Sequence, residues 1–192
     1  MAKTFFDQSS VTPGRLGQNP LAGQTSFAQF GQGNPEMFGN ALNQWRQATQ
    51  GMSEEEKKER VNFCLQRVNL LNANKLMPSE ISGGMKKRVA IARAIAPNPK
   101  YLFCDEPNSG LDPRTSIVID NLIKEITMEY QITTMVNTHD MNSVLEMGDK
   151  IVYLHQGSKW WEGTVEDILR TDNKELNEFI FASKLAQSVK KV

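Results

Sequence analysis

From residue 101 onward, short apolar segments typical of strands alternate with segments that have helical spacing. The first, YLFCDEP, places four consecutive apolar residues, Tyr101 to Cys104, directly before two carboxylates. Such a run without polar alternation indicates a strand buried on both faces, as in a parallel sheet. ITTMV is a second strand of this kind, and KIVYLHQGSKWWEG reads as two strands around a Gln156-Gly157 turn. We therefore expect an α/β domain with a largely parallel sheet.

The composition of the chain changes sharply near residue 52. Residues 1–51 contain eight Gln, seven Gly and four Asn, but only five charged residues. A segment of this kind buries little apolar surface when it folds. We expect residues 1–52 to form an atypical, poorly ordered N-terminal segment and residues 53–192 to form the folded part.

Charge and cysteine content exclude several classes of protein. Lys plus Arg and Asp plus Glu both number 22, so the chain lacks the basic footprint of a nucleic-acid-binding protein. Cys64 and Cys104 have no metal-site spacing, which suits buried thiols in a reducing compartment. The sequence also lacks a run of transmembrane length and a signal-peptide core. We expect a cytoplasmic protein that reaches a membrane only through a partner, with no nucleic-acid partner.

Two helices before residue 100 have clear start signals. SEEEKKERVNFCLQRVNLL opens with Ser53 and Glu56 at capping-box spacing and continues with apolar residues at helical spacing. In ISGGMKKR, Ser82 is an N-cap residue, while Gly83 and Gly84 allow the backbone to approach a ligand closely. The free N–H groups of this helix N-terminus suit a phosphate. An isolated Ser-Gly-Gly can equally do no more than start a helix.

Polar residues follow the predicted strands, where α/β sheets bind their ligands. Asp105 and Glu106 follow the first strand, and His139 lies in the NTHD loop after the second. Taken singly, paired acids are often simply solvent-exposed, and a lone histidine is often structural. Taken together, an apolar strand that ends in Asp-Glu resembles a Walker B strand, whose Asp holds Mg²⁺ and whose Glu can orient or deprotonate water.

Four motifs in this order resemble those of the ABC-type ATPases, the nucleotide-binding subunits of ABC transporters. ISGGMKKR is similar to the signature motif, YLFCDE to the Walker B strand, SGLDP to the D-loop and NTHD to the switch histidine. The resemblance implies an incomplete P-loop NTPase fold. Residues 53–96 would form part of the helical subdomain and the signature helix, and residues 97–192 the Walker B strand, D-loop, switch and C-terminal region. The methionine after Ser-Gly-Gly, with KLMPSE before it, is most similar to the Mla/Mce phospholipid-transport ATPases.

The resemblance also implies partners and roles. In this family the signature of one subunit closes over the ATP bound to the P-loop of a second subunit, and a membrane permease binds the pair at the inner face of the cytoplasmic membrane. Ser82, Gly83 and Gly84 would therefore contact a partner's ATP, and Asp112, an N-cap before Pro113, would lie along the same dimer interface.

Within its own subunit each of three further residues would have a separate role. Asp105 would hold Mg²⁺, Glu106 would act as the base, and His139 would contact the γ-phosphate.

The chain departs from this family because it has no recognisable P-loop. The pattern G-x-x-x-x-G-K-[ST] requires Gly-Lys, and none of the 13 glycines precedes a lysine. The nearest approach is QNPLAGQT, residues 18–25, with Gln18 and Gln24 at the key positions, and the surroundings of Gln29 do not support a Q-loop. We expect poor ATP binding in the chain's own site, no hydrolysis by the isolated chain, and uncovered strand edges inside the sheet. Residues 1–51 could be a natural alternative N-terminus, a recombined stretch or an engineered replacement.

Three functions remain open at this stage. The first is an ABC-transporter ATPase subunit that couples ATP hydrolysis to the transport of phospholipid or another hydrophobic substrate. The second is a catalytically incompetent fragment or partner that donates its signature to an intact subunit. The third is a soluble, non-transport ABC ATPase of DNA repair or translation, which salt-dependent nucleic-acid binding would favour.

Overall fold

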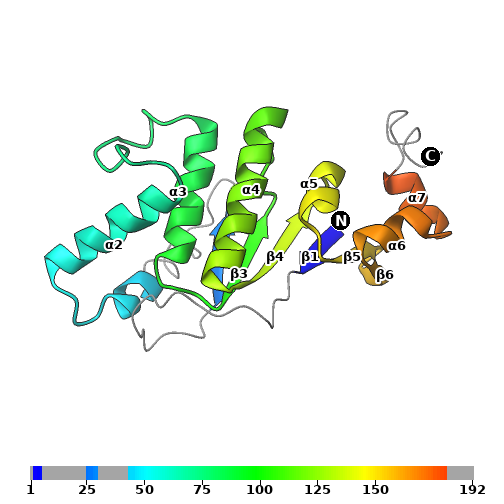
Figure 1. Ribbon diagram of the computed structural model, residues 1–192, viewed down its shortest axis with the longest axis horizontal. Coiled ribbons are helices and arrows are strands. Elements are labelled where there is room, and N and C mark those ends of the chain that lie inside the picture. The colour runs from blue at the N-terminus through cyan, green and yellow to red at the C-terminus, as the bar shows by residue number, and fades with distance from the viewer. Residues whose placement is uncertain (1, 6–24, 30–42, 181–192) are drawn as a thin grey trace.

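The computed structural model describes residues 2–5, 25–29 and 43–180, which form one mixed sheet with helices packed on it (Figure 1). The strands are β1 (Ala2–Phe5), β2 (Thr25–Gln29), β3 (Tyr101–Asp105), β4 (Thr133–Thr138), β5 (Lys150–His155) and β6 (Ser158–Gly163). The helices are α2 (Glu54–Arg67), α3 (Gly83–Ile95), α4 (Pro113–Tyr130), α5 (Met141–Met147), α6 (Val165–Arg170) and α7 (Lys174–Ile180).

The sheet has the strand order β2-β3-β4-β1-β5-β6. β3 pairs in parallel with β2 and β4, whereas β1 pairs antiparallel with both β4 and β5, and β6 pairs antiparallel with β5. It follows that β2, β3, β4 and β5 all run in one direction, while β1 and β6 run the opposite way. The predicted α/β class is confirmed, and four of the six described strands run in one direction, although three of the five strand pairings are antiparallel.

β1 occupies an interior position that the sequence did not predict for it. Ala2 lies opposite Thr138 of β4 on one side and Tyr153 of β5 on the other, so β1 joins the two neighbouring strands. The expectation that interior strand edges would be left uncovered is therefore wrong for β4 and β5. The physical reason is that strand pairing uses backbone N–H and C=O groups, which the polar N-terminal sequence supplies as well as an apolar one.

Several parts of residues 1–52 belong to the same fold as the rest of the chain. They contribute β1 and β2, and residues 43–48 are helical. The nearest approach to a phosphate loop, residues 18–25, lies outside the described residues except for Thr25. The division of the chain near residue 52 stays a prediction, although β2 on one side of it pairs with β3 on the other.

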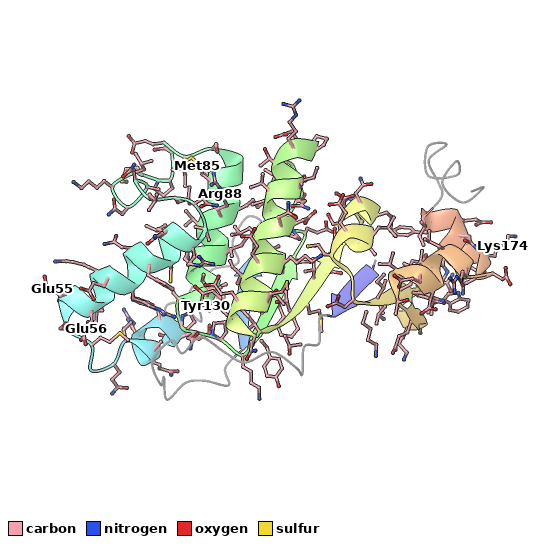
Figure 2. All side chains as sticks on the ribbon, viewed as in Figure 1. Glu55, Glu56, Met85, Arg88, Tyr130 and Lys174 are labelled. Atoms are coloured by element: carbon pink, nitrogen blue, oxygen red, sulfur yellow. The ribbon has the colours of Figure 1, made fainter. Side chains whose placement is uncertain are left out.

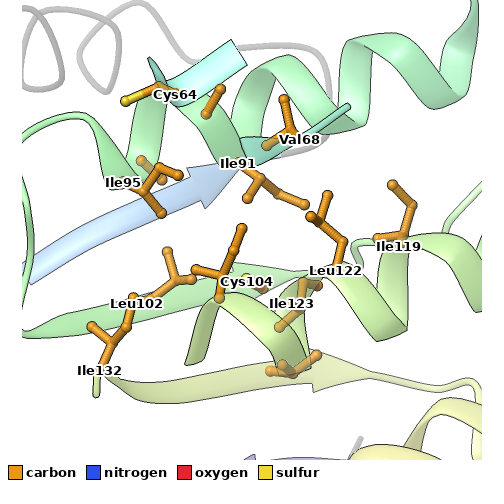
Figure 3. Close-up of a cluster of buried hydrophobic side chains, with 14 of the residues drawn as sticks. Cys64, Val68, Ile91, Ile95, Leu102, Cys104, Ile119, Leu122, Ile123 and Ile132 are labelled. Carbon is orange, nitrogen blue, oxygen red and sulfur yellow. The ribbon is translucent and has the colours of Figure 1, made fainter. Parts of the chain in front are cut away.

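The main hydrophobic core lies between the sheet and the helices α2, α3 and α4 (Figure 3). Ile91 and Ile95 of α3 and Ile123 of α4 are fully buried, and they pack with Leu102 of β3. Burying a side chain of this size stabilises a fold by about 1.5–3 kcal/mol. Cys64 and Cys104 belong to this cluster, and burial raises the pKa of the Cys104 thiol to about 12. The expectation of buried thiols is confirmed.

Two arginines connect α2 with α3. Arg60 donates to the carbonyl oxygens of Ile95 and Ala96 at the C-terminus of α3. Arg88 on α3, labelled in Figure 2, donates to the carbonyl oxygens of Val68 and Asn69 just after α2. Cations at helix C-termini complement the partial negative charge of unpaired carbonyls. This pair of contacts fixes the angle between the two helices and thus the position of the α3 N-terminus.

The sequence signals for helix starts agree with the structure. Ser53 and Glu56 form a reciprocal capping box at α2, Ser82 caps α3, and Asp112 caps α4 with Pro113 in the first turn. The predicted β5–β6 hairpin is also present. Gln156 and Gly157 have φ of 47° and 76°, the left-handed values of a tight hairpin turn.

Candidate functional site

The candidate site lies where the parallel strands end. Gln29, Asp105 and Asn137 are neighbours across β2, β3 and β4. The Asn137 amide donates to the Asp105 carboxylate at 2.6 Å, so the side chains at the ends of β3 and β4 are joined directly. This register places the Gln29 backbone beside the predicted Mg²⁺ ligand, a neighbour that the sequence around Gln29 did not indicate.

Glu106 and His139 are brought together one residue beyond these strand ends. His139 Nδ1 lies 2.9 Å from the Glu106 carboxylate. This hydrogen bond, together with the negative charge of Glu106, raises the pKa of His139 above its ordinary value. Because the His139 side chain is 70% exposed, the contact leaves the imidazole accessible to a ligand. Two residues that lie 33 positions apart thus form one acid–base pair in an open site.

A buried polar network lies beneath this pair. Asn108 donates to Asp120 Oδ1 at 2.7 Å and to Ser143 Oγ at 2.9 Å, and Ser143 donates to Asp120 Oδ2 at 2.8 Å. All three residues are buried, and desolvation raises the pKa of Asp120. The network links the loop after Glu106 to α4 and to α5, the helix that follows His139. Sequence reasoning missed these three residues because each is an ordinary polar residue in a loop or helix pattern.

The network borders a cleft of about 510 Å³. The cleft is lined from one side by the D-loop residues that follow Glu106, and from the other by residues 138–142 around His139. Glu106, His139 and Asp120 all contribute to its walls. The site is therefore a concave surface with a carboxylate and an imidazole at its rim.

The signature glycines lie beside the D-loop of the same chain. A side chain at Gly84 would meet the Thr115 methyl group at 2.8 Å, and one at Gly83 would lie 3.7 Å from Leu111. Ser82 caps this helix by accepting from the Met85 N–H at 3.2 Å. The close approach therefore favours glycine over any larger residue at position 84.

Asp112 has a defined local role in the structure. Its carboxylate accepts from the N–H groups of Arg114 and Thr115 at 3.1 Å and from the Thr115 hydroxyl at 2.5 Å. The hydroxyl bond is the main cause of its lowered pKa. Asp112 thus fixes the start of α4 and the orientation of Thr115 under Gly84.

The fit of Mg²⁺ to this site rests on the Asp105 carboxylate. No cluster of three metal-ligating side chains occurs among residues 43–180 and the described parts of β1 and β2. Mg²⁺ commonly keeps several water ligands and takes only one or two carboxylates together with substrate phosphates. One exposed carboxylate at a strand end therefore fits this ion when it is bound together with a nucleotide.

Comparison with known proteins identifies the class and then the family. The fold is similar to a dimeric ATP-binding cassette in a post-hydrolysis state bound to ADP and Pi, with a TM-score of 0.60 and 31% identity. That match covers 73% of this chain and 63% of the cassette. The class is therefore the P-loop NTPase fold of the ABC ATPases. The family profile described as ABC transporter matches residues 3–109, and the chain belongs to this family.

Two relatives are named as methionine import ATP-binding proteins. The methionine import ATP-binding protein MetN of Campylobacter jejuni is 42% identical, over 67% of this chain and 38% of that protein. MetN of Carboxydothermus hydrogenoformans is 39% identical, over 72% and 42% of the two chains. The chain thus spans about two fifths of the length of these relatives. They do not support the expected Mla/Mce assignment or a phospholipid substrate.

Among residues 2–5, 25–29 and 43–180, no helix is both long and apolar enough to cross a membrane.

Proposed function

We propose that the chain is an ATP-binding subunit of an ABC transporter that works as a dimer and couples ATP hydrolysis to transport. The contact between Glu106 and His139 at the ends of β3 and β4 carries this proposal, because it places a candidate base beside a candidate phosphate ligand. The similarity to a dimeric cassette bound to ADP and Pi supports the dimer.

The roles of individual residues belong to the same proposal. Glu106 orients or deprotonates the attacking water, and His139 contacts the γ-phosphate. Asp105 holds Mg²⁺, which supplies charge neutralisation for the phosphates when bound.

Residues on α3 and in the D-loop serve the partner's nucleotide. Ser82, Gly83 and Gly84 present the α3 N-terminus to the ATP of the second subunit, where free N–H groups favour a phosphate. Asp112 orients the D-loop beside them. A membrane permease binds the dimer and holds it at the inner face of the cytoplasmic membrane.

One sequence observation favours a second candidate function, in which the chain donates its signature to an intact subunit and hydrolyses nothing itself. None of its 13 glycines precedes a lysine, so the lysine that contacts the β- and γ-phosphates is missing.

The transported substrate is a separate question. Methionine is the cargo given in the names of the MetN relatives, whereas the phospholipid expected from the Ser-Gly-Gly-Met signature has no support from them. The ATP-binding subunit contacts the nucleotide and the permease. Similarity of its fold to that of a relative therefore does not show that the two transporters carry the same substrate. Stimulation of ATP turnover in the reconstituted transporter, by methionine or by phospholipid vesicles, separates the two.

The test of the signature role is a substitution at Ser82. In a mixture of the chain with an intact ABC subunit, Ser82→Arg should abolish turnover of the partner's ATP, because the long cation blocks closure on the phosphate. Ser82 is also an N-cap, so the control is Ser53→Ala, which removes a cap on α2. Unchanged turnover with Ser82→Arg would refute the signature role.

A further inference from the structure

Lys87 places an ammonium group inside the protein, on the helix that carries the signature residues. The residue is only 8% exposed, and its Nζ donates to the carbonyl oxygen of Glu106 at 3.1 Å. Desolvation lowers the pKa of this ammonium, and the carboxylates of Glu106 and Asp105 oppose that shift. Burying an ammonium is unfavourable unless it is hydrogen-bonded and near opposite charge. Lys87 meets both conditions at the turn that carries the candidate base.

Glu106 has a backbone conformation that needs such support. Its φ is 49°, in the left-handed region that residues with a Cβ rarely adopt. Conformations of this kind persist where the surroundings over-determine them. The Glu106 N–H donates to the Asn137 carbonyl at 2.8 Å, and its own carbonyl accepts from the Ser109 N–H at 3.2 Å and from Lys87.

These three bonds come from three different parts of the chain. Asn137 belongs to β4 and Ser109 to the loop after Glu106, whereas Lys87 belongs to α3. Lys87 therefore supplies the bond from the signature helix to the Glu106 turn. It lies five positions after Ser82, which corresponds to about 7.5 Å along a helix.

We propose that Lys87 is a positioning residue that holds Glu106 in its left-handed conformation and so ties the signature helix to the turn that carries the candidate base. A displacement of the α3 N-terminus, such as closure on a partner's phosphate, reaches the Glu106 carbonyl through this side chain. The consequence for ATP turnover rests on the proposed function. The positioning itself does not, and it can be measured in the free chain.

The test uses the titration of His139 in the full chain, followed by the NMR signals of the imidazole protons. The sequence has two histidines, so His155 supplies an internal reference signal. If Lys87→Met releases the Glu106 turn, the carboxylate leaves His139 and the pKa of His139 falls by about 0.5 pH unit or more. Loss of a nearby positive charge, without movement of Glu106, would instead raise the pKa of His139. The two explanations therefore predict shifts of opposite sign.

Matched variants complete the experiment. Lys86→Met removes the same charge from the same helix at an exposed position and should leave the titration of His139 unchanged. Lys87→Arg keeps a cationic donor and should restore most of the wild-type pKa of His139. Lys87→Gln, a milder change with the same expected direction, carries the test if Lys87→Met does not fold.

Amide hydrogen exchange gives an independent readout. The Glu106 amide, which is bonded to Asn137, should exchange about tenfold faster in Lys87→Met and at the wild-type rate in Lys86→Met. A His139 pKa that is unchanged or raised, together with unchanged exchange at Glu106, would overturn the proposal. If these shifts occur but the chain supports no turnover of a partner's ATP, the proposed function fails while the role of Lys87 stands.

Discussion

Replacing Asp120 with alanine should destabilise the chain markedly, whereas replacing it with asparagine should not. The Asp120 carboxylate accepts hydrogen bonds from Asn108 at 2.7 Å and Ser143 at 2.8 Å, and the three residues are 3%, 7% and 1% exposed, respectively. Asp120→Ala removes both acceptors, so one N–H group of Asn108 and the O–H group of Ser143 are left buried without an acceptor, while Asn108 keeps its bond to Ser143 Oγ. Asp120→Asn keeps an acceptor for Asn108 and gives Ser143 a donor in place of an acceptor.

The magnitude follows from these contacts. A buried donor without a partner costs about 1–3 kcal/mol, so two of them predict a loss of about 2–6 kcal/mol for Asp120→Ala. Removal of the buried carboxylate offsets part of this loss, because desolvation disfavours its ionised form in the wild-type protein. For Asp120→Asn the bond from Asn108 is retained, the bond with Ser143 runs in the opposite direction, and the charge is gone. We expect its free energy of unfolding at pH 7 to lie within about 1 kcal/mol of wild type, or above it.

The difference in stability between Asp120→Asn and wild type should change with pH in one direction. Burial, reinforced by the negative charges of Asp140 and Glu146, raises the pKa of Asp120 in the folded state above its unfolded value near 3.8. A raised carboxyl pKa stabilises the fold fully below the unfolded pKa, and this contribution is lost as pH rises through the folded pKa. The stability of Asp120→Asn relative to wild type should therefore increase between pH 4 and pH 7.

Urea denaturation followed by tryptophan fluorescence, repeated at several pH values, measures all three proteins. The reasoning is refuted if Asp120→Asn is as destabilised as Asp120→Ala at pH 7. It is also refuted if the difference between wild type and Asp120→Asn does not change with pH.

Two further predictions concern the signature helix and the candidate base. Gly84→Ala should destabilise the chain by about 1–2 kcal/mol in thermal unfolding, because the new Cβ meets the Thr115 methyl group at 2.8 Å, and overpacking outweighs the gain in helix propensity. Gly83→Ala, with 3.7 Å to its neighbour, is the matched control and should be nearly neutral. The isolated chain should show no significant ATP turnover, and measurable turnover that Glu106→Gln abolishes would contradict this.

The part of the fold that could be predicted from sequence is the part with strong local signals. The helix starts at Ser53, Ser82 and Asp112 were predictable because short polar side chains satisfy the free N–H groups of a first turn. Strand β3 was predictable from its unbroken apolar run. The expected burial on both faces is wrong, because Leu102 and Cys104 are buried whereas Tyr101 on the other face is exposed. Asp105, which ends this strand, and Glu106, which follows it, located the candidate site because α/β sheets bind their ligands at the carboxyl ends of the strands.

The positions of β1 and β2 could not be predicted from the same signals. Both are short strands in a Gln-rich segment, and they are placed by pairing with strands more than 70 residues away in sequence. The contact of Lys87 with Glu106 was hidden for a similar reason. On a helical pattern Lys87 reads as one of three consecutive cations, and only the packing of α3 against β3 makes it a buried donor.

The measurement that tests the account most directly is a calorimetric titration of the folded full-length chain with ATP, with and without Mg²⁺, alone and with an intact ABC subunit. The account predicts no tight binding by the chain alone, because it lacks the Gly-Lys of a P-loop. In the mixture it predicts Mg²⁺-dependent binding that is tighter than that of the intact subunit titrated by itself. Tight Mg²⁺-dependent binding by the chain alone would contradict it, since the chain would then contain a complete phosphate site of its own.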